Sequence, residues 1–161
     1  MNAEERRKFV DTHRTAIFGY SRKNDGPSMS VVYYVMDGED ILVSTMFERG
    51  KAKAVLRNPK VSLCVLDEKW PPTYLLVYCN TGIESDIEAS TDLLMRIAGV
   101  MAGQPMPDSA RPNLKKVAVA EKRLVLRLKP YQTFETPPRH VSKPEDTREL
   151  THWLGSALPW K

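Results

Sequence analysis

The sequence has few of the residues that metal sites and disulfides require. Its 161 residues include only two cysteines, Cys64 and Cys79, and three histidines. His13, His140 and His152 stand far apart, and their spacing to the cysteines matches no metal-ligand pattern. Two thiols in an intracellular chain are expected to stay reduced. We therefore predict no metal centre and no disulfide, and we place both cysteines in strands.

Several catalytic motifs are also missing. The chain contains no Gly-x-Ser-x-Gly nucleophile motif and no Gly-x-Gly-x-x-Gly dinucleotide fingerprint. Gly50-Lys51 is followed by Ala52, and no glycine stands five residues earlier, so a phosphate-binding P-loop is excluded as well. The sequence therefore shows none of the residue patterns that the common hydrolase mechanisms require. No catalytic residue, and in particular no proton donor, can be named from the sequence.

Long apolar runs and blocks of one charge are absent too. No stretch approaches the roughly 20 apolar residues that span a bilayer, and residues 1–8 are too charged for a signal peptide. The 24 Lys and Arg residues and 20 Asp and Glu residues give a net charge of +4, with the cations scattered along the chain. Nucleic-acid faces need a contiguous basic stripe. We expect a cytoplasmic protein with neither a membrane nor a nucleic-acid partner.

What is present is a series of strand patterns. The length predicts one domain, with a body over residues 1–136 and a tail over residues 137–161. β-Branched and aromatic residues between turn signals predict strands at residues 14–20, 28–36, 41–45, 60–67, 73–88 and 123–131. The Asp-Gly turn at residues 37–40 predicts a hairpin. Gly82 suggests a β-bulge within the fifth strand.

Helical patterns separate some of these strands. Asn2 is expected to cap a helix that ends before His13. Residues 51–58 have an apolar stripe that Pro59 terminates. A third helix is expected to begin at Ser90 or Thr91 and to end at Gly103, with residues 106–112 as a loop. In the tail, helical spacing predicts a short docking helix that contains Leu150, Trp153, Leu154 and Leu158.

Strands joined by tight turns must be antiparallel. Residues 28–36 are apolar on both faces, so one face is expected in a core and the other against a further surface. A closed antiparallel barrel whose outer face packs on a partner chain meets both requirements. The partner could be a second copy of the chain.

One segment has the composition of an anion site. Ser44 and Thr45 end a strand, and Arg49, Lys51 and Lys53 surround the start of a helix. Helix N-termini present free amide donors that favour an anion, and hydroxyls and cations add to this. Residues two apart on a helix point to nearly opposite sides, so the two lysines converge only if Lys51 precedes the helix. Solvated lysines on an exposed helix would produce the same pattern.

Three segments, taken in order, resemble the flavin-binding split-barrel superfamily related to pyridoxamine 5'-phosphate oxidase. Residues 25–34 (DGPSMSVVYY) are similar to its Asp-Gly-x-Pro…Ser-Pro-Val-Trp-Tyr strand, and residues 41–45 (ILVST) to its second hairpin strand. Residues 51–63 (KAKAVLRNPKVSL) resemble its Arg/Lys-x-Lys-x-x-Asn-Leu-x-x-x-Pro-x-Val-Ser block. Val31, Tyr33 and Val55 depart from the usual Pro, Trp and Asn. The likeness is greatest to the flavin- and deazaflavin-dependent oxidoreductases of actinobacteria.

The resemblance implies a mostly β antiparallel split β-barrel and a homodimer with cofactor sites at the subunit interface. The cofactor would be FMN or the deazaflavin coenzyme F420. By position in the motifs, the phosphate would lie at Lys51 and Lys53, and Ser44 and Thr45 would contact phosphate or ribityl oxygens. The ring would lie along Ser30, Val31, Val32 and Tyr33, some of which could instead be ordinary barrel core.

The function implied is an oxidoreductase that transfers hydride to a small conjugated or unsaturated substrate, with Tyr33, Tyr34, Trp70 and Tyr74 as candidates to shape the pocket. No substrate-phosphate signature of true pyridoxamine phosphate oxidases is visible, so that activity is not expected. Two alternatives remain open. One is a non-catalytic carrier of flavin, haem or tetrapyrrole on the same fold, and the other is an interaction domain without a ligand.

Overall fold

The structure is a computed structural model that describes residues 1–69, 73–136 and 155–161. Its centre is a closed antiparallel barrel in which the strands lie in the order β3-β2-β1-β4-β5-β6 and β3 pairs with β6 to close it. These strands are β1 (Thr15–Tyr20), β2 (Ser28–Asp37), β3 (Asp40–Met46), β4 (Lys60–Asp67), β5 (Thr73–Glu84) and β6 (Arg123–Glu135). The prediction of a mostly β antiparallel barrel is confirmed.

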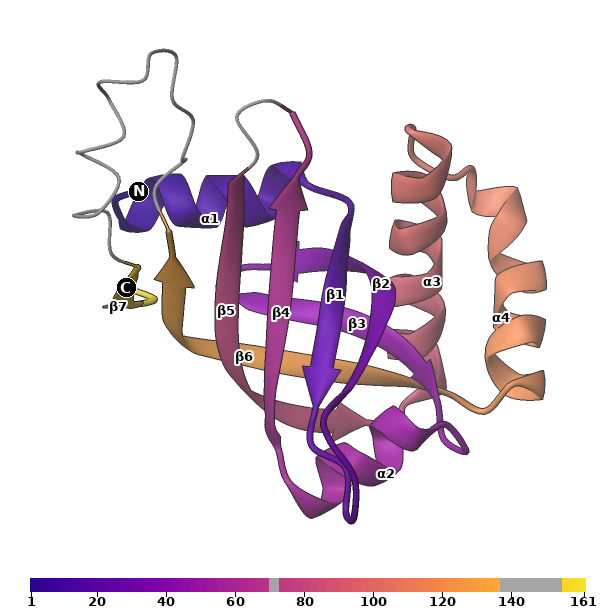
Figure 1. The fold of residues 1–161 in the computed structure, drawn as a ribbon. Coiled ribbons are helices and arrows are strands. Elements are labelled where there is room, and N and C mark those ends of the chain that lie inside the picture. The colour runs from indigo at the N-terminus through magenta and orange to yellow at the C-terminus, as the bar shows by residue number, and fades with distance from the viewer. Residues whose placement is uncertain (70–72, 137–154) are drawn as a thin grey trace.

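Helices cover the two ends and one side of this barrel (Figure 1). α1 (Ala3–Thr12) crosses one end and α2 (Gly50–Arg57) lies at the opposite end. α3 (Ile87–Ala102) and α4 (Arg111–Ala120) pair beside the barrel, where α3 packs on β2, β3 and β6. None of the described helices is both long and apolar enough to cross a membrane.

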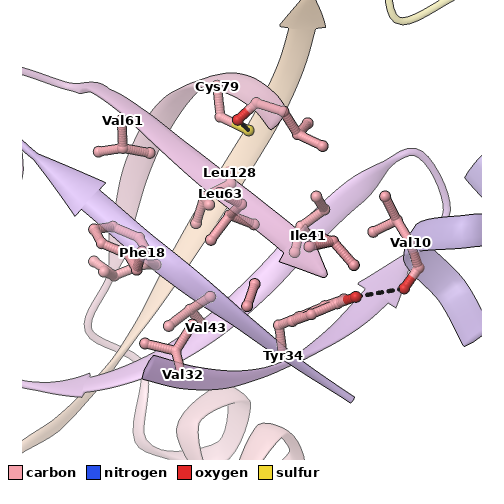
Figure 2. Packing of buried hydrophobic residues seen from close by; sticks show 14 of the residues in the cluster. Val10, Phe18, Val32, Tyr34, Ile41, Val43, Val61, Leu63, Cys79 and Leu128 are labelled. Carbon is pink, nitrogen blue, oxygen red and sulfur yellow. Dashed lines mark hydrogen bonds between the residues drawn. The ribbon is translucent and has the colours of Figure 1, made fainter. Parts of the chain in front are cut away.

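Alternation along each strand separates the barrel interior from its outside. Inward positions form one apolar cluster, which includes Phe18, Tyr34, Leu63 and Leu128 (Figure 2). Outward residues of β2, β3 and β6 form a second cluster with α3, centred on Leu93. Both faces of β2 are therefore covered over its second half, as its two-sided apolar pattern predicts.

Tyr34 joins the barrel to α1. Its side chain is buried, and its hydroxyl donates to the backbone oxygen of Val10 at 2.6 Å (Figure 2). Tyr34→Phe is expected to lower the free energy of unfolding by about 1–3 kcal/mol, because it leaves a buried carbonyl without its donor. Tyr33→Phe, on the outward-facing neighbour, is the matched control and should change it little. Equal urea midpoints for the two variants would contradict this account of Tyr34.

The first half of the chain follows the predicted elements closely. α1 begins after Asn2, whose side chain accepts from the Glu5 amide while the Glu5 carboxylate accepts from the Asn2 amide. α2 begins at Gly50, one residue before its predicted start, and ends at Arg57. Cys64 points outward from β4 and Cys79 is buried inside β5, and both are free thiols.

Three predictions for the second half are wrong. α3 begins at Ile87 because Asp86 accepts from the Ala89 amide, so it starts before Ser90 and Thr91 and shortens the preceding strand. The loop predicted over residues 106–112 instead contains a 3₁₀ turn and the start of α4. The bulge lies at the Tyr78/Cys79 register shift opposite Pro130, and Gly82 pairs regularly with Arg127.

The described end of the tail is a strand. β7 (Ser156–Pro159) pairs with the second half of β6, so Leu158 lies in a strand and not in the predicted helix. Leu150, Trp153 and Leu154, the other residues of that prediction, lie outside the described residues. Trp160 follows β7 and is buried in the barrel cluster, which fixes this end of the chain to the body.

Candidate functional site

A groove of about 370 Å³ lies beside the barrel, between β2, β3, the start of α2 and one flank of α3. Its floor is formed mainly by outward side chains of β2 and β3, and two buried residues, Val32 and Thr45, also border it. The lining residues are Val31, Val32, Tyr33, Ser44, Thr45, Met46, Arg49, Lys51, Leu94, Ile97, Met101 and Arg123. They divide into a cationic end and an apolar stretch.

The cationic end is built on the start of α2. The first amide groups of a helix have no acceptor within it, and the N-cap residue Arg49 makes no side-chain capping bond. Arg49 and Lys51 both line the groove at this point. Free amide donors, the positive end of the helix dipole and two cations thus converge, which is the arrangement that an anion such as phosphate favours.

Lys51 is the central cation of this end. It is half-buried, and burial together with the neighbouring Arg49 charge lowers its pKa below the ordinary value. Its ammonium group lies 5.8 Å from the centre of the Phe18 ring. Among the described residues no carboxylate forms an ion pair with it. A bound anion would supply that missing charge.

Arg123 closes the same end from β6. Its guanidinium Nη1 donates to the Ser44 hydroxyl at 3.4 Å, and Nε donates to Glu121 at 2.6 Å. β3 pairs with β6 in a register that places Met46 opposite Arg123. The sequence shows only that Arg123 begins an alternating strand. The contact with Ser44 depends on the β3–β6 pairing that closes the barrel, and sequence patterns do not give that pairing.

The rest of the groove is apolar. Val31 and Tyr33 project outward from β2, and Leu94, Ile97 and Met101 line the opposite wall from one flank of α3. A flat, apolar group could lie between the two walls while a charged end reached Lys51. The α3 residues were predicted only as an inward helical stripe. Their role in the groove follows from where α3 docks.

The structure brings together six of the eight residues predicted to bind a cofactor: Val31, Val32, Tyr33, Ser44, Thr45 and Lys51. Ser30 does not line the groove, and its buried hydroxyl has no partner within the described part of the chain. Lys53 lies in a separate hollow with Lys23 and Arg57. Lys51 is already inside α2, so the two lysines point to different sides, as helix geometry requires.

The other aromatic candidates do not line the groove. Tyr34 belongs to the barrel core, and the Tyr74 hydroxyl lies 2.8 Å from the Thr136 hydroxyl. Trp70 falls outside the described residues. Within the described ranges, no three His, Cys, Asp or Glu side chains are placed to hold a metal ion.

Comparisons with known proteins show which family and which solved structures the chain resembles. A sequence model of the pyridoxamine 5'-phosphate oxidase family matches residues 3–136. Conserved hypothetical protein Rv2991 from Mycobacterium tuberculosis is 19% identical, with a TM-score of 0.74 over 90% of this chain and 94% of that one. A structure described as an F420 reductase is 18% identical, with a TM-score of 0.63 over 78% and 93%.

The heme storage protein HutZ from Vibrio cholerae is also similar, at 17% identity and a TM-score of 0.57 over 79% of this chain and 88% of that one. At such identities the likeness shows the shared fold. A search of curated protein sequences finds no match. The family match covers most of the chain and agrees with the closed antiparallel barrel described above. The chain therefore belongs to the pyridoxamine 5'-phosphate oxidase family.

Proposed function

We propose that the groove binds FMN or coenzyme F420 and that the protein is an oxidoreductase that reduces a small conjugated or unsaturated substrate. One observation supports this above the others. A cationic helix start and an apolar strand face lie in a single groove, and the two match the phosphate and the ring of such a cofactor. The family and the similar F420 reductase are consistent with this proposal.

The residues of the chain would mainly bind and orient. Lys51, Arg49 and the first amides of α2 would hold the phosphate, and the Ser44 and Thr45 positions would border the ribityl chain. Val31 and Leu94, on opposite walls of the groove, would exclude water from the ring between them. When bound, the cofactor itself supplies the hydride chemistry. No described side chain is assigned a proton-transfer step.

The same arrangement supports a homodimer with the cofactor site at its interface. The outer face of β1, β4, β5 and the first half of β2 is not covered by any described helix. Strand register aligns one mostly apolar row across it: Val31, Ile17, Cys64, Leu76 and Phe134. Exposed apolar patches of this kind mark protein interfaces. Val31 belongs both to this row and to the groove, so a second copy on the face would border the cofactor.

Val31→Lys is expected to convert the dimer to a monomer, because it places a charge within the apolar row. Val31 is 71% exposed in the single chain. Leu56→Lys is the matched control, since Leu56 is 68% exposed but lies on α2, away from the row. Light scattering after size exclusion measures the mass. A wild-type monomer, or two variants with the same mass as wild type, would contradict the dimer proposal.

The direct test of the function is titration of the pure protein with FMN and with F420, followed by ligand fluorescence. The proposal is supported if each chain binds one equivalent of either cofactor and if the other cofactor displaces it. Binding of neither in the micromolar range would remove it and leave a haem or tetrapyrrole carrier and the interaction domain without a ligand as the remaining explanations. Reduction of a quinone or nitro acceptor by the loaded protein then tests turnover.

A carrier of flavin, haem or tetrapyrrole is the second candidate. The likeness to a heme storage protein supports it. The described lining of the groove contains no His or Cys, so a haem bound there would depend on Tyr33, Met46 or Met101 as its axial ligand. Tight binding without turnover on any acceptor would identify a carrier. Exchangeable substrate and repeated turnover would identify the enzyme.

A further inference from the structure

A second cavity, larger than the groove, lies on the opposite flank of α3. It has a volume of about 610 Å³ and lies between the end of α1, the second half of β2 and the C-terminal part of α3. Ligand sites of drug-sized molecules fall in this range. In Figure 1 the end of α1 and the end of α3 lie on the same side of the barrel, opposite α2.

The cavity and the groove share two elements but use different parts of them. Val31, Val32 and Tyr33 line the groove, and the next three residues, Tyr34, Val35 and Met36, line the cavity. On α3, Leu94 faces the groove and its neighbour Met95 lines the cavity. Lys51 belongs only to the groove. The α3 residues of the groove and those of the cavity occupy opposite sides of that helix, so α3 stands between the two sites.

The walls of the cavity are mostly apolar and adaptable. Met36, Met95 and Met106 contribute three thioethers, which adjust to irregular or flat aromatic surfaces. Gly99 allows a close approach of the following loop, because a Cβ there would meet the backbone oxygen of Gln104 at 3.2 Å. The loop that follows α3 therefore packs directly against the helix, and both contribute to the cavity wall.

Charge at the rim favours an anion. Arg14 and Arg96 line the cavity, with Asp11 as the one carboxylate among the lining residues. The Arg96 guanidinium already has partners within the protein, since it donates to the Met36 carbonyl and forms an ion pair with Asp37 at 3.6 Å. Arg14 forms no ion pair or hydrogen bond with any residue in the described part of the chain. It is an available cation beside an apolar chamber.

We propose that this cavity is a second ligand site, separate from the groove, and that it takes a conjugated, largely apolar molecule that carries one acidic group, with the acidic group at Arg14. The assignment is independent of the proposed function, because the cavity and the groove share no lining residue. It stands on the cavity alone and can be tested without any cofactor.

The test uses two dyes of similar shape. Anilinonaphthalene sulfonate is aromatic and anionic, and N-phenylnaphthylamine is its uncharged relative. Wild-type protein is expected to bind both, with a rise in dye fluorescence. Arg14→Gln should weaken the anionic dye by about tenfold, the scale of one charge-assisted contact, and leave the neutral dye unchanged. Equal effects on both dyes, or none, would overturn the assignment of Arg14.

Filling the cavity distinguishes it from other apolar surfaces. Met95→Trp should abolish binding of both dyes and leave FMN or F420 affinity intact, whereas its neighbour Leu94→Trp should do the reverse. Met106→Trp fills the cavity from the loop and replaces Met95→Trp if that variant does not fold, which circular dichroism checks. Dye that still binds to the filled variants reports the open sheet face and overturns the proposal.

The outcomes separate the two proposals. If Met95→Trp no longer binds the dyes and the wild-type protein binds neither cofactor, the cavity is a ligand site and the oxidoreductase proposal is wrong. If the wild-type protein binds a cofactor and the filled variants keep their dye affinity, the proposed function stands and the cavity is not the ligand site.

Discussion

Lys51→Ala is expected to weaken FMN or F420 binding by about 10- to 100-fold. The residue lies at the start of α2 and lines the groove, and no described carboxylate neutralises it. A charge-assisted bond to phosphate contributes about 1.5–3 kcal/mol, which corresponds to that range of affinities. Fluorescence titration measures the change. The fold should not suffer, because the alanine also removes a cation whose burial is unfavourable, as its lowered pKa shows.

Lys53→Ala is the matched control, from the same helix and with the same charge removed. Lys53 faces a different hollow, so its loss should change cofactor affinity by less than about threefold. Equal losses in the two variants would mean that only the overall charge matters and would contradict the phosphate site. The sequence motifs pair the two lysines, and the structure separates them.

The pH dependence of binding has a definite sign. The pKa of Lys51 lies below its ordinary value of 10.5 in the free protein, and a bound anion would raise it. Affinity should therefore be constant at neutral pH and fall as pH rises through the lowered pKa of the free protein. Lys51→Ala should remove this fall. A wild-type affinity that stays flat up to the ordinary lysine range would contradict the role of Lys51.

Trp160→Ala is expected to lower the free energy of unfolding by about 3–5 kcal/mol, the usual effect of removing a large buried ring. Trp160 is only 2% exposed and packs in the barrel cluster. Its indole donates to Glu39 at 2.8 Å, and Arg6 donates to the preceding Pro159 carbonyl at 2.6 Å. The C-terminal strand is thus joined to both α1 and the β2–β3 turn. Urea unfolding measures the change.

Trp160→Phe serves as the control for this variant. It keeps most of the ring in the cluster and loses the donor to Glu39, so it should cost clearly less than Trp160→Ala. If Trp160→Ala has the same urea midpoint of unfolding as the wild-type protein, strand β7 is not docked on β6 in solution. That result would remove the structural role of the tail while leaving the barrel and the groove unaffected.

The strands and the first two helices could be predicted because each depends on local signals. Asn2 with Glu5 forms a capping box, and Pro59 stops a helix whatever surrounds it. Where local signals compete, prediction was wrong. Asp86, Ser90 and Thr91 can all cap a helix, and the position of β6 decides among them, since the buried Ser90 hydroxyl donates to the Arg123 carbonyl.

Local patterns predicted the antiparallel barrel and the hairpin order, because alternation and turn chemistry act over a few neighbouring residues. The β2 residues of the groove were predicted from their position in the motifs of the family that the sequence resembles. Three features of the groove became visible only once the chain was folded: Arg123 reaches Ser44, Lys53 lies outside the groove, and α3 supplies the facing wall. Those outcomes depend on barrel closure between β3 and β6 and on helix docking. Both bring together residues far apart in the chain, and no local pattern encodes their distance.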